Sequence, residues 1–246
     1  MRLLYRLGIV MICFALIGGH SIFAGEHSPG MTPHEALLKL QDGNTRFAEA
    51  QNSHPHQTVE RRLDVAKGQH PFAVILSCAD SRVPPEVIFD QGLGDLFVVR
   101  VAGNVVTPEV QGSIEYAVDH LGAGLIVALG HERCGAVSAA LAGGEAPGQI
   151  GSLVRAIAPA IESYREKFED TPTLDDAVRA NVERVVHQLK TSAPILTEQI
   201  EKGHVRVVGA RYDLDDGRVD FIVRDGLEES PAAEEKSGKE KKEEGD

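Results

Sequence analysis

Two cysteines and one histidine stand at the ends of apolar segments of the chain. Cys78 ends the apolar run 71–78, His131 ends the run 124–131, and Cys134 follows three residues later in an HxxC spacing. Two thiolates and one imidazole suit Zn²⁺, and three protein ligands leave a fourth position open for water, as in catalytic zinc sites. If a helix begins at Cys134, its N-terminus also favours the thiolate. These three residues are therefore candidate metal ligands.

Each of these residues also has a simpler interpretation. Two cysteines in an exported protein are typical of a disulfide, so a bond between Cys78 and Cys134 is an alternative to the metal site. A lone HxxC spacing is weakly specific, and a histidine at a strand end is more often a structural residue. The third cysteine, Cys13, lies in an N-terminal segment that we expect to be removed.

A carboxylate and a guanidinium follow Cys78 in the segment CADSR, at Asp80 and Arg82. In a surface loop such a pair is an ion pair with little energetic consequence. Beside a metal, the Asp80 carboxylate could act in either of two ways. It occupies the fourth position on the ion, or it pairs with Arg82 and accepts a hydrogen bond from a bound hydroxide. The partner of Asp80 therefore decides whether water can bind.

Apolar runs and amphipathic segments alternate along the chain, which is typical of an α/β protein. Strands are expected over four buried apolar runs and over a late segment that follows a DDG turn and is expected to be antiparallel: 71–78, 95–104, 124–131, 205–210 and 219–223. Helices are expected over the segments with helical periodicity, the last of them broken near Pro194: 32–50, 59–67, 108–121, 153–168 and 174–202. This order predicts a mostly parallel central sheet of four to five strands flanked by helices, with an N-terminal helical arm.

A recognisable start signal opens the N-terminal arm. In TPHE, Thr32 is expected to cap the helix, Pro33 to occupy its first position, and Glu35 to complete a capping box.

The predicted sheet is expected to position the candidate ligands. In an open parallel sheet, ligands bind at the carboxyl ends of strands where the winding reverses. If the strands ending at Cys78 and His131 are neighbours, the two side chains meet there.

The two ends of the chain are expected to lie outside the fold. Residues 1–24 have a basic start, a short apolar centre and a cleavage site at Ala24, which together indicate a signal peptide. The apolar centre is too short to span a bilayer, so no stable membrane span is expected after its removal. Residues 228–246 contain many acids and lysines and no large apolar side chain, which predicts a disordered tail. One domain, 25–227, is therefore expected in the periplasm or the medium.

Composition excludes one large class of partners. The chain has 25 Lys and Arg against 37 Asp and Glu, a formal net charge of -12, and no Trp. A nucleic-acid-binding protein needs positive charge for the phosphates and often aromatic side chains for stacking on bases. We therefore expect a small-molecule substrate and no nucleic acid.

Five segments together resemble the β-class carbonic anhydrases, in the plant-type branch and in an exported bacterial form. They are CADSRVPPE (78–86), VVRVAGN (98–104), GSIEYAV (112–118), GHERCGA (130–136) and GARYDLDDGRV (209–219). The CxDxR and HxxC motifs, about fifty residues apart and each after a buried strand, carry most of the specificity. The resemblance implies that Cys78, His131 and Cys134 bind Zn²⁺ and that Asp80 and Arg82 form a catalytic dyad.

The resemblance also implies a substrate pocket. Gln69 matches a glutamine that hydrogen-bonds the substrate, Phe97, Ala102 and Tyr116 match residues that line the carbon dioxide pocket, and Gly135 would offer a backbone amide. Ala102 departs from the family pattern, where a larger aliphatic side chain is common, and this affects the size of the pocket. For Gln69, Phe97 and Tyr116 a structural role in the core or a turn is the alternative.

The activity that the resemblance implies is the reversible hydration of carbon dioxide to bicarbonate and a proton, with zinc-bound hydroxide as the nucleophile. In the family, N-terminal helices wrap a partner subunit and the pocket is shared between chains, so a homodimer or a multiple of dimers is expected. Two further functions stay open. A relative of the same fold could hydrolyse carbon disulfide or carbonyl sulfide, and a non-catalytic protein could bind zinc without using Arg82.

Overall fold

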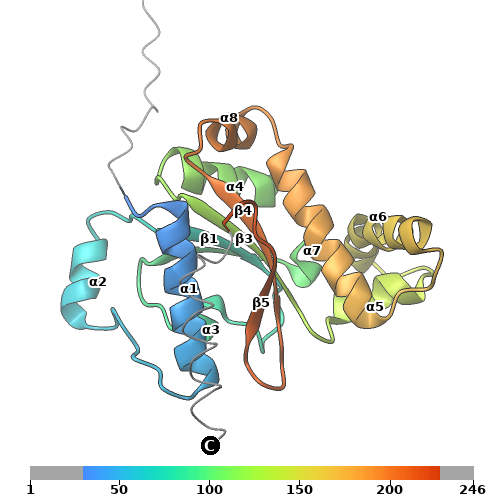
Figure 1. Ribbon diagram of the computed structural model, residues 1–246, viewed down its shortest axis with the longest axis horizontal. Coiled ribbons are helices and arrows are strands. Elements are labelled where there is room, and N and C mark those ends of the chain that lie inside the picture. The colour runs from blue at the N-terminus through green and yellow to red at the C-terminus, as the bar shows by residue number, and fades with distance from the viewer. Residues whose placement is uncertain (1–29, 228–246) are drawn as a thin grey trace, which may run out of the picture.

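The computed structural model describes residues 30–227 (Figure 1). The predicted signal peptide at 1–24 and the predicted charged tail at 228–246 lie outside the described residues. Between residues 30 and 227, no helix combines the length and the apolar character that crossing a membrane requires.

A five-stranded sheet in the order β2-β1-β3-β4-β5 forms the centre of the described chain. Four strands are parallel, and the last pairs with β4 in the antiparallel direction. Their bounds are β1 (Ala73–Ser77), β2 (Leu96–Arg100), β3 (Leu125–His131), β4 (Arg206–Tyr212) and β5 (Val219–Val223). The predicted mostly parallel sheet is confirmed. Strands β1 and β3 are direct neighbours, and the winding reverses between them.

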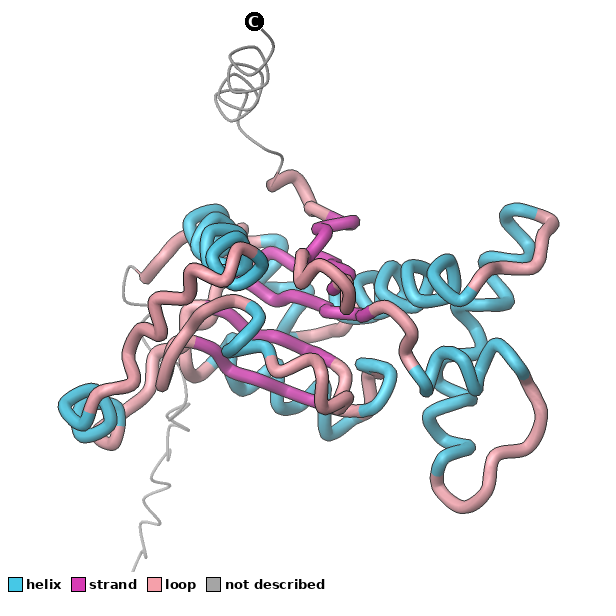
Figure 2. Tube along the Cα trace, turned by 90° about the horizontal axis from the view of Figure 1, so that it is seen from below, coloured by secondary structure: helices cyan, strands magenta, loops and turns pink. Residues whose placement is uncertain are grey.

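Helices cover both faces of this sheet (Figure 2). Apolar side chains of α4 (Pro108–Asp119), α7 (Leu174–Lys190) and α8 (Ile195–Glu201) pack on one face. On the other face lie α1 (Pro33–Ala48) and the short α3 (Pro85–Ile88). A third apolar cluster joins α5 (Gly135–Ala142), α6 (Ile150–Phe168) and the start of α7, and it contains both Cys78 and Cys134. The candidate ligands thus lie where the sheet meets α5, α6 and the start of α7.

Most of the predicted elements are found, with corrections at their bounds. The Thr32 capping box is present, since the Glu35 N–H donates to Thr32 Oγ1 and the Glu35 carboxylate accepts from the Thr32 N–H. Helix α2 is shorter than expected (Val59–Val65), whereas the expected break near Pro194 is confirmed, since α7 ends at Lys190 and α8 begins at Ile195. Strand β2 was expected to be buried on both faces, but it lies at the edge of the sheet and its residues are half-buried or exposed.

A buried amide on α1 forms hydrogen bonds with two other parts of the fold. The Asn44 side chain donates hydrogen bonds to Ile88 O (3.2 Å) and Gly217 O (2.9 Å). Its Oδ1 accepts from the Val219 N–H at 2.8 Å. Asn44 therefore connects the N-terminal arm to α3 and to the turn between β4 and β5.

We predict that Asn44→Ala lowers the free energy of unfolding by about 1–3 kcal/mol, because buried backbone groups lose their partner. Urea denaturation followed by circular dichroism measures this change. Asp42→Ala, on the exposed side of the same helix, is the matched control and should leave the midpoint unchanged. Equal midpoints for the Asn44 variant and the original protein would contradict the prediction.

Candidate metal centre

The fold brings two sulfur atoms and one imidazole together at the carboxyl edge of the sheet. Cys78 directly follows β1, His131 is the last residue of β3, and Cys134 is the N-cap of α5. One ligand atom from each lies within 4.8 Å of the other two, and the three residues are 4%, 0% and 1% exposed. Both cysteines are free, so the alternative of a disulfide between them is wrong. The geometry agrees with the predicted ligand set.

The electrostatics of this group fit a divalent cation. His131 Nδ1 lies 2.8 Å from the Glu132 carbonyl oxygen, which fixes the ring, while His131 Nε2 is buried and has no hydrogen-bond partner. The pKa of the Cys78 thiol is lowered, chiefly because the Cys134 thiol donates a hydrogen bond to its sulfur. The pKa of Cys134 is raised by that shared proton and by burial. Two sulfurs and an unpartnered imidazole nitrogen form a donor set that zinc binds.

Asp80 pairs with Arg82. Arg82 Nε donates to Asp80 Oδ1 at 2.9 Å and Arg82 Nη2 donates to Asp80 Oδ2 at 2.8 Å, a bidentate pair. These bonds hold the pKa of the Asp80 carboxyl well below its usual range. Asp80 Oδ2 is still only 3.8 Å from His131 Nε2. The carboxylate therefore borders the ligand group without belonging to it.

Arg100 supports the loop that carries Cys78 and Asp80. It is the last residue of β2, where its register partner is Ser77. Its guanidinium donates to the Cys78 carbonyl oxygen at 3.0 Å and to the Asp80 carbonyl oxygen at 2.6 Å. Arg100 was not among the predicted site residues. Its only signal in the sequence is a charge at the end of an apolar strand.

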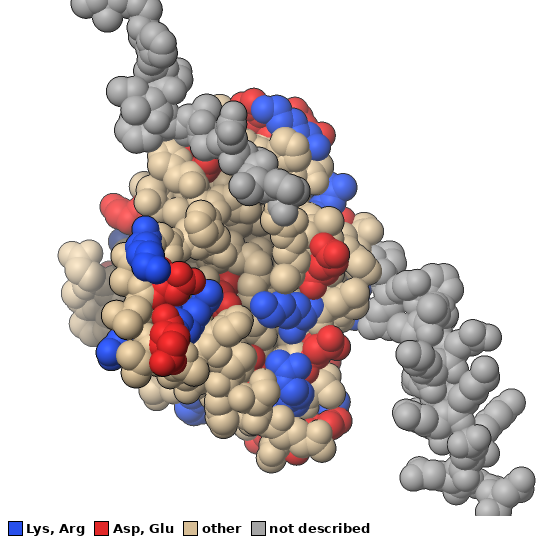
Figure 3. Space-filling view, turned by 90° about the vertical axis from the view of Figure 1, so that its left-hand side faces the viewer, with Lys and Arg blue, Asp and Glu red and all other residues tan. Residues whose placement is uncertain are grey.

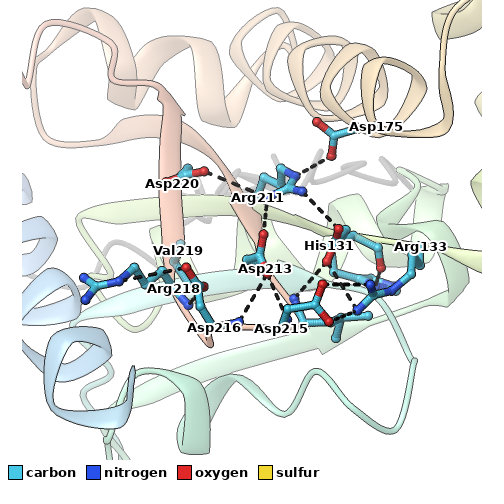
Figure 4. A network of polar contacts seen from close by, with 12 residues as sticks. His131, Arg133, Asp175, Arg211, Asp213, Asp215, Asp216, Arg218, Val219 and Asp220 are labelled. Atoms are coloured by element: carbon cyan, nitrogen blue, oxygen red, sulfur yellow. Dashed lines mark hydrogen bonds and ion pairs between the residues drawn. The ribbon is translucent and has the colours of Figure 1, made fainter. Parts of the chain in front are cut away.

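The turn between His131 and Cys134 is held by the end of β4 and by the segment that joins β4 to β5 (Figure 4). The Glu132 N–H donates to the Tyr212 carbonyl oxygen at 2.9 Å. Arg133, whose φ of 52° lies in the left-handed region, donates twice to the Asp215 carboxylate, at 2.9 and 2.7 Å. Buried Arg211 lies beside Glu132, with 3.6 Å between Nη2 and Oε1. The late motif GARYDLDDGRV thus braces the turn that carries two candidate ligands.

Some of the predicted substrate residues lie at the carboxyl ends of the parallel strands, and the others lie near the amino ends. Ala102 begins the 3₁₀ turn η1 (Ala102–Asn104) and Gly135 directly follows Cys134, so both lie at the carboxyl ends of the strands, where the candidate ligands are. Phe97 pairs with Val74, near the start of β1. Tyr116, in the last turn of α4, packs against Phe97 with 6.4 Å between the ring centroids.

Gln69 lies still farther from the ligand group of its own chain. It precedes Ala73, the first residue of β1, by four positions, whereas Cys78 follows the last residue of that strand. The length of β1 therefore separates Gln69 from Cys78, a distance of about 16 Å. Within one chain, Gln69, Phe97 and Tyr116 are not brought to the candidate metal centre.

Because both cysteines are free, we predict that the full chain, denatured without reductant in the presence of a chelator, reacts as three thiols with a disulfide reagent. The third is Cys13. A Cys78→Ser variant is the control and should give one thiol fewer. If the unaltered chain gave one thiol and the count rose by two after reduction, a Cys78–Cys134 bond would be present and the metal centre excluded.

Comparisons with known proteins agree with this site. A family model described as carbonic anhydrase matches residues 73–219. Carbonic anhydrase 2 of Mycobacterium tuberculosis is 44% identical over 203 residues, which are 81% of this chain and 96% of that protein. The carbonic anhydrase of Pseudomonas aeruginosa is 38% identical over 196 residues, 76% of this chain and 87% of that protein.

A solved structure has the same fold. It belongs to a study of two tetrameric β-carbonic anhydrases from Sordaria macrospora, with 29% identity, a TM-score of 0.61, and coverage of 77% of this chain and 95% of that one. The family model spans more than half of this chain, and its segment includes all three candidate ligands together with Asp80 and Arg82. The chain therefore belongs to the β-class carbonic anhydrases.

Proposed function

We propose that this enzyme hydrates carbon dioxide reversibly with Zn²⁺ held by Cys78, His131 and Cys134. The observation that carries the proposal is the burial of these three donors within 4.8 Å of one another, with His131 Nε2 buried and without a hydrogen-bond partner. Zinc bound there would supply Lewis-acid chemistry that acidifies water and makes it nucleophilic at neutral pH. With three protein ligands, a position for that water stays open.

Asp80 and Arg82 supply the hydrogen-bonding part of the site. Arg82 holds both carboxylate oxygens of Asp80 and lowers its pKa, so Asp80 stays ionised at neutral pH and acts only as a hydrogen-bond acceptor. Because it lies 3.8 Å from His131 Nε2, its carboxylate could accept a hydrogen bond from a water held beside the three donors. The same guanidinium keeps the carboxylate from taking the place of that water itself.

Asp80→Asn tests this role. The variant should keep zinc, because Asp80 is not in the ligand group, but lose at least about 10²-fold in hydration rate, because the amide presents a donor where an acceptor is needed. Zinc content by atomic absorption and stopped-flow hydration measure the two effects. Ser81→Ala, an exposed neighbour in the same loop, is the control. Full hydration activity in Asp80→Asn would refute the dyad role.

The same assay separates the remaining candidate functions. Carbonyl sulfide and carbon disulfide should be offered beside carbon dioxide, since a hydrolase of the same fold would turn over those gases instead. A protein that holds zinc and converts none of the three would be a zinc-binding protein without catalysis.

We further propose that two chains share each pocket. Gln69, Phe97 and Tyr116 lie away from the ligand group of their own chain, so only a neighbouring chain can bring them to it. Tyr116 is 46% exposed, and apolar side chains of α1 and α2 are also exposed: Leu38 (44%), Val59 (55%) and Leu63 (60%). On the side of the molecule where α2 lies, acidic and basic side chains lie close to one another, and large areas of the surface carry neither (Figure 3). Such a surface suits a second copy better than a strongly charged partner.

Complementation tests the shared pocket. A Gln69→Ala chain keeps its own Asp80, and an Asp80→Asn chain keeps its own Gln69. If the pocket is shared, co-expression should give mixed oligomers with activity that neither variant has alone. Cys78→Ser co-expressed with Asp80→Asn is the matched control, because both changes fall in the part of the site that each chain supplies to itself. Mixed oligomers without recovered activity would show that Gln69 does not act across chains.

A further inference from the structure

Helix α7 carries one amide on an otherwise apolar buried face. Asn181 is 1% exposed, and the other buried residues of the helix are all apolar: Ala177, Val178, Val182, Val185, Val186 and Leu189. Burying an amide side chain among such residues is unfavourable unless it forms hydrogen bonds. The presence of an amide at this position therefore requires a specific partner.

That partner is the backbone next to a candidate metal ligand. Asn181 Nδ2 donates to the Gly103 carbonyl oxygen at 3.0 Å, in a buried contact between segments 78 residues apart. The Gly103 N–H in turn donates to Cys78 Sγ at 3.3 Å. A single residue thus lies between the Asn181 amide and the sulfur of Cys78.

Gly103 has a backbone conformation that favours glycine. Its φ of 73° and the φ of 42° at the following Asn104 both lie in the left-handed region, which Gly adopts freely and Asn more readily than most other residues. A Cβ on Gly103 would lie 2.7 Å from Ile157 Cδ1 and 3.2 Å from Ala136 Cβ. Side chains of α5 and α6 therefore close in on Gly103 at its Cα, while Asn181 holds its carbonyl group.

We propose that Asn181 is a positioning residue for the metal centre, which holds the Gly103 amide on the sulfur of Cys78. The proposal rests on the proposed function, because it takes that sulfur to be a metal ligand. A hydrogen bond to a thiolate draws electron density from the sulfur and fixes its direction. Groups that orient ligands in this way typically change metal affinity by about 10- to 100-fold when they are lost.

The test uses Asn181→Leu, which removes the donor and leaves a side chain of similar size that suits the apolar face. The variant and the original protein are loaded with Co²⁺, whose thiolate charge-transfer bands report on the sulfur ligands, and their zinc affinities are measured by competition with a chromophoric chelator. We expect the variant to fold, its charge-transfer band to move to longer wavelength, and its zinc dissociation constant to rise about tenfold or more.

Val185→Ala is the control for a general loss of packing. Val185 is buried one turn farther along the same face of α7 and touches neither Gly103 nor the ligands through any hydrogen bond. It should lower the melting temperature and leave the cobalt spectrum unchanged. If Asn181→Leu does not fold, Asn181→Ser, which is smaller and keeps a hydroxyl, is measured in the same way with the same expected direction.

Three results would overturn a statement made above, one of them the metal centre and two of them the role of Asn181. If the original protein binds cobalt without any thiolate charge-transfer band, the proposed metal centre itself is wrong. If the original protein shows that band, but the Asn181 variant has the same band position and a dissociation constant within twofold, Asn181 is not a positioning residue. An equal band shift in Val185→Ala would overturn the inference as well, because packing alone would then explain the effect.

Discussion

Parallel pairing of β1 with β3 brings Cys78 and His131 to one edge of the sheet. Ser77 is the register partner of Leu129, so Cys78 leaves its strand beside Gly130, one residue before His131. A slip of one residue would turn the imidazole to the opposite face of the sheet, because side chains alternate along a strand. Every residue of both strands is buried against helices on the two faces, so burial alone does not set this register, and the fit of the side chains against those helices does. The position of the metal centre is thus a consequence of how the core packs.

Support for the ligands comes from three parts of the chain that are distant in sequence. The Arg100 guanidinium donates hydrogen bonds to carbonyl groups of the loop after β1. The β4–β5 segment holds the turn after β3. Helix α7 contacts Gly103, whose N–H donates to the Cys78 sulfur. Each contact ends on backbone next to a candidate ligand or on a residue beside one. The ligands themselves therefore need little local rigidity, and the surrounding elements supply it.

Much of this arrangement could be predicted from the sequence, because its signals are local. The Thr32 capping box, the continuous apolar strands and the HxxC spacing each depend on residues that are close together in the sequence. The edge position of β2, the side on which Gln69 lies, and the partners of Arg100 and Asn181 depend on strand order and helix packing, which local patterns do not contain. Export, predicted from residues 1–24, stays a prediction, as does the disorder of residues 228–246.

Both cysteines belong to the apolar cluster that α5 and α6 form with the start of α7. An ion bound by Cys78 and Cys134 would therefore tie the sheet to these helices, much as a covalent cross-link would. Binding of the ion and packing of α5 and α6 on the sheet would then be one linked equilibrium, because ligands that are assembled only in the folded state convert binding free energy into stability. When the metal is scarce, α5 and α6 would then unfold locally before the sheet loses stability.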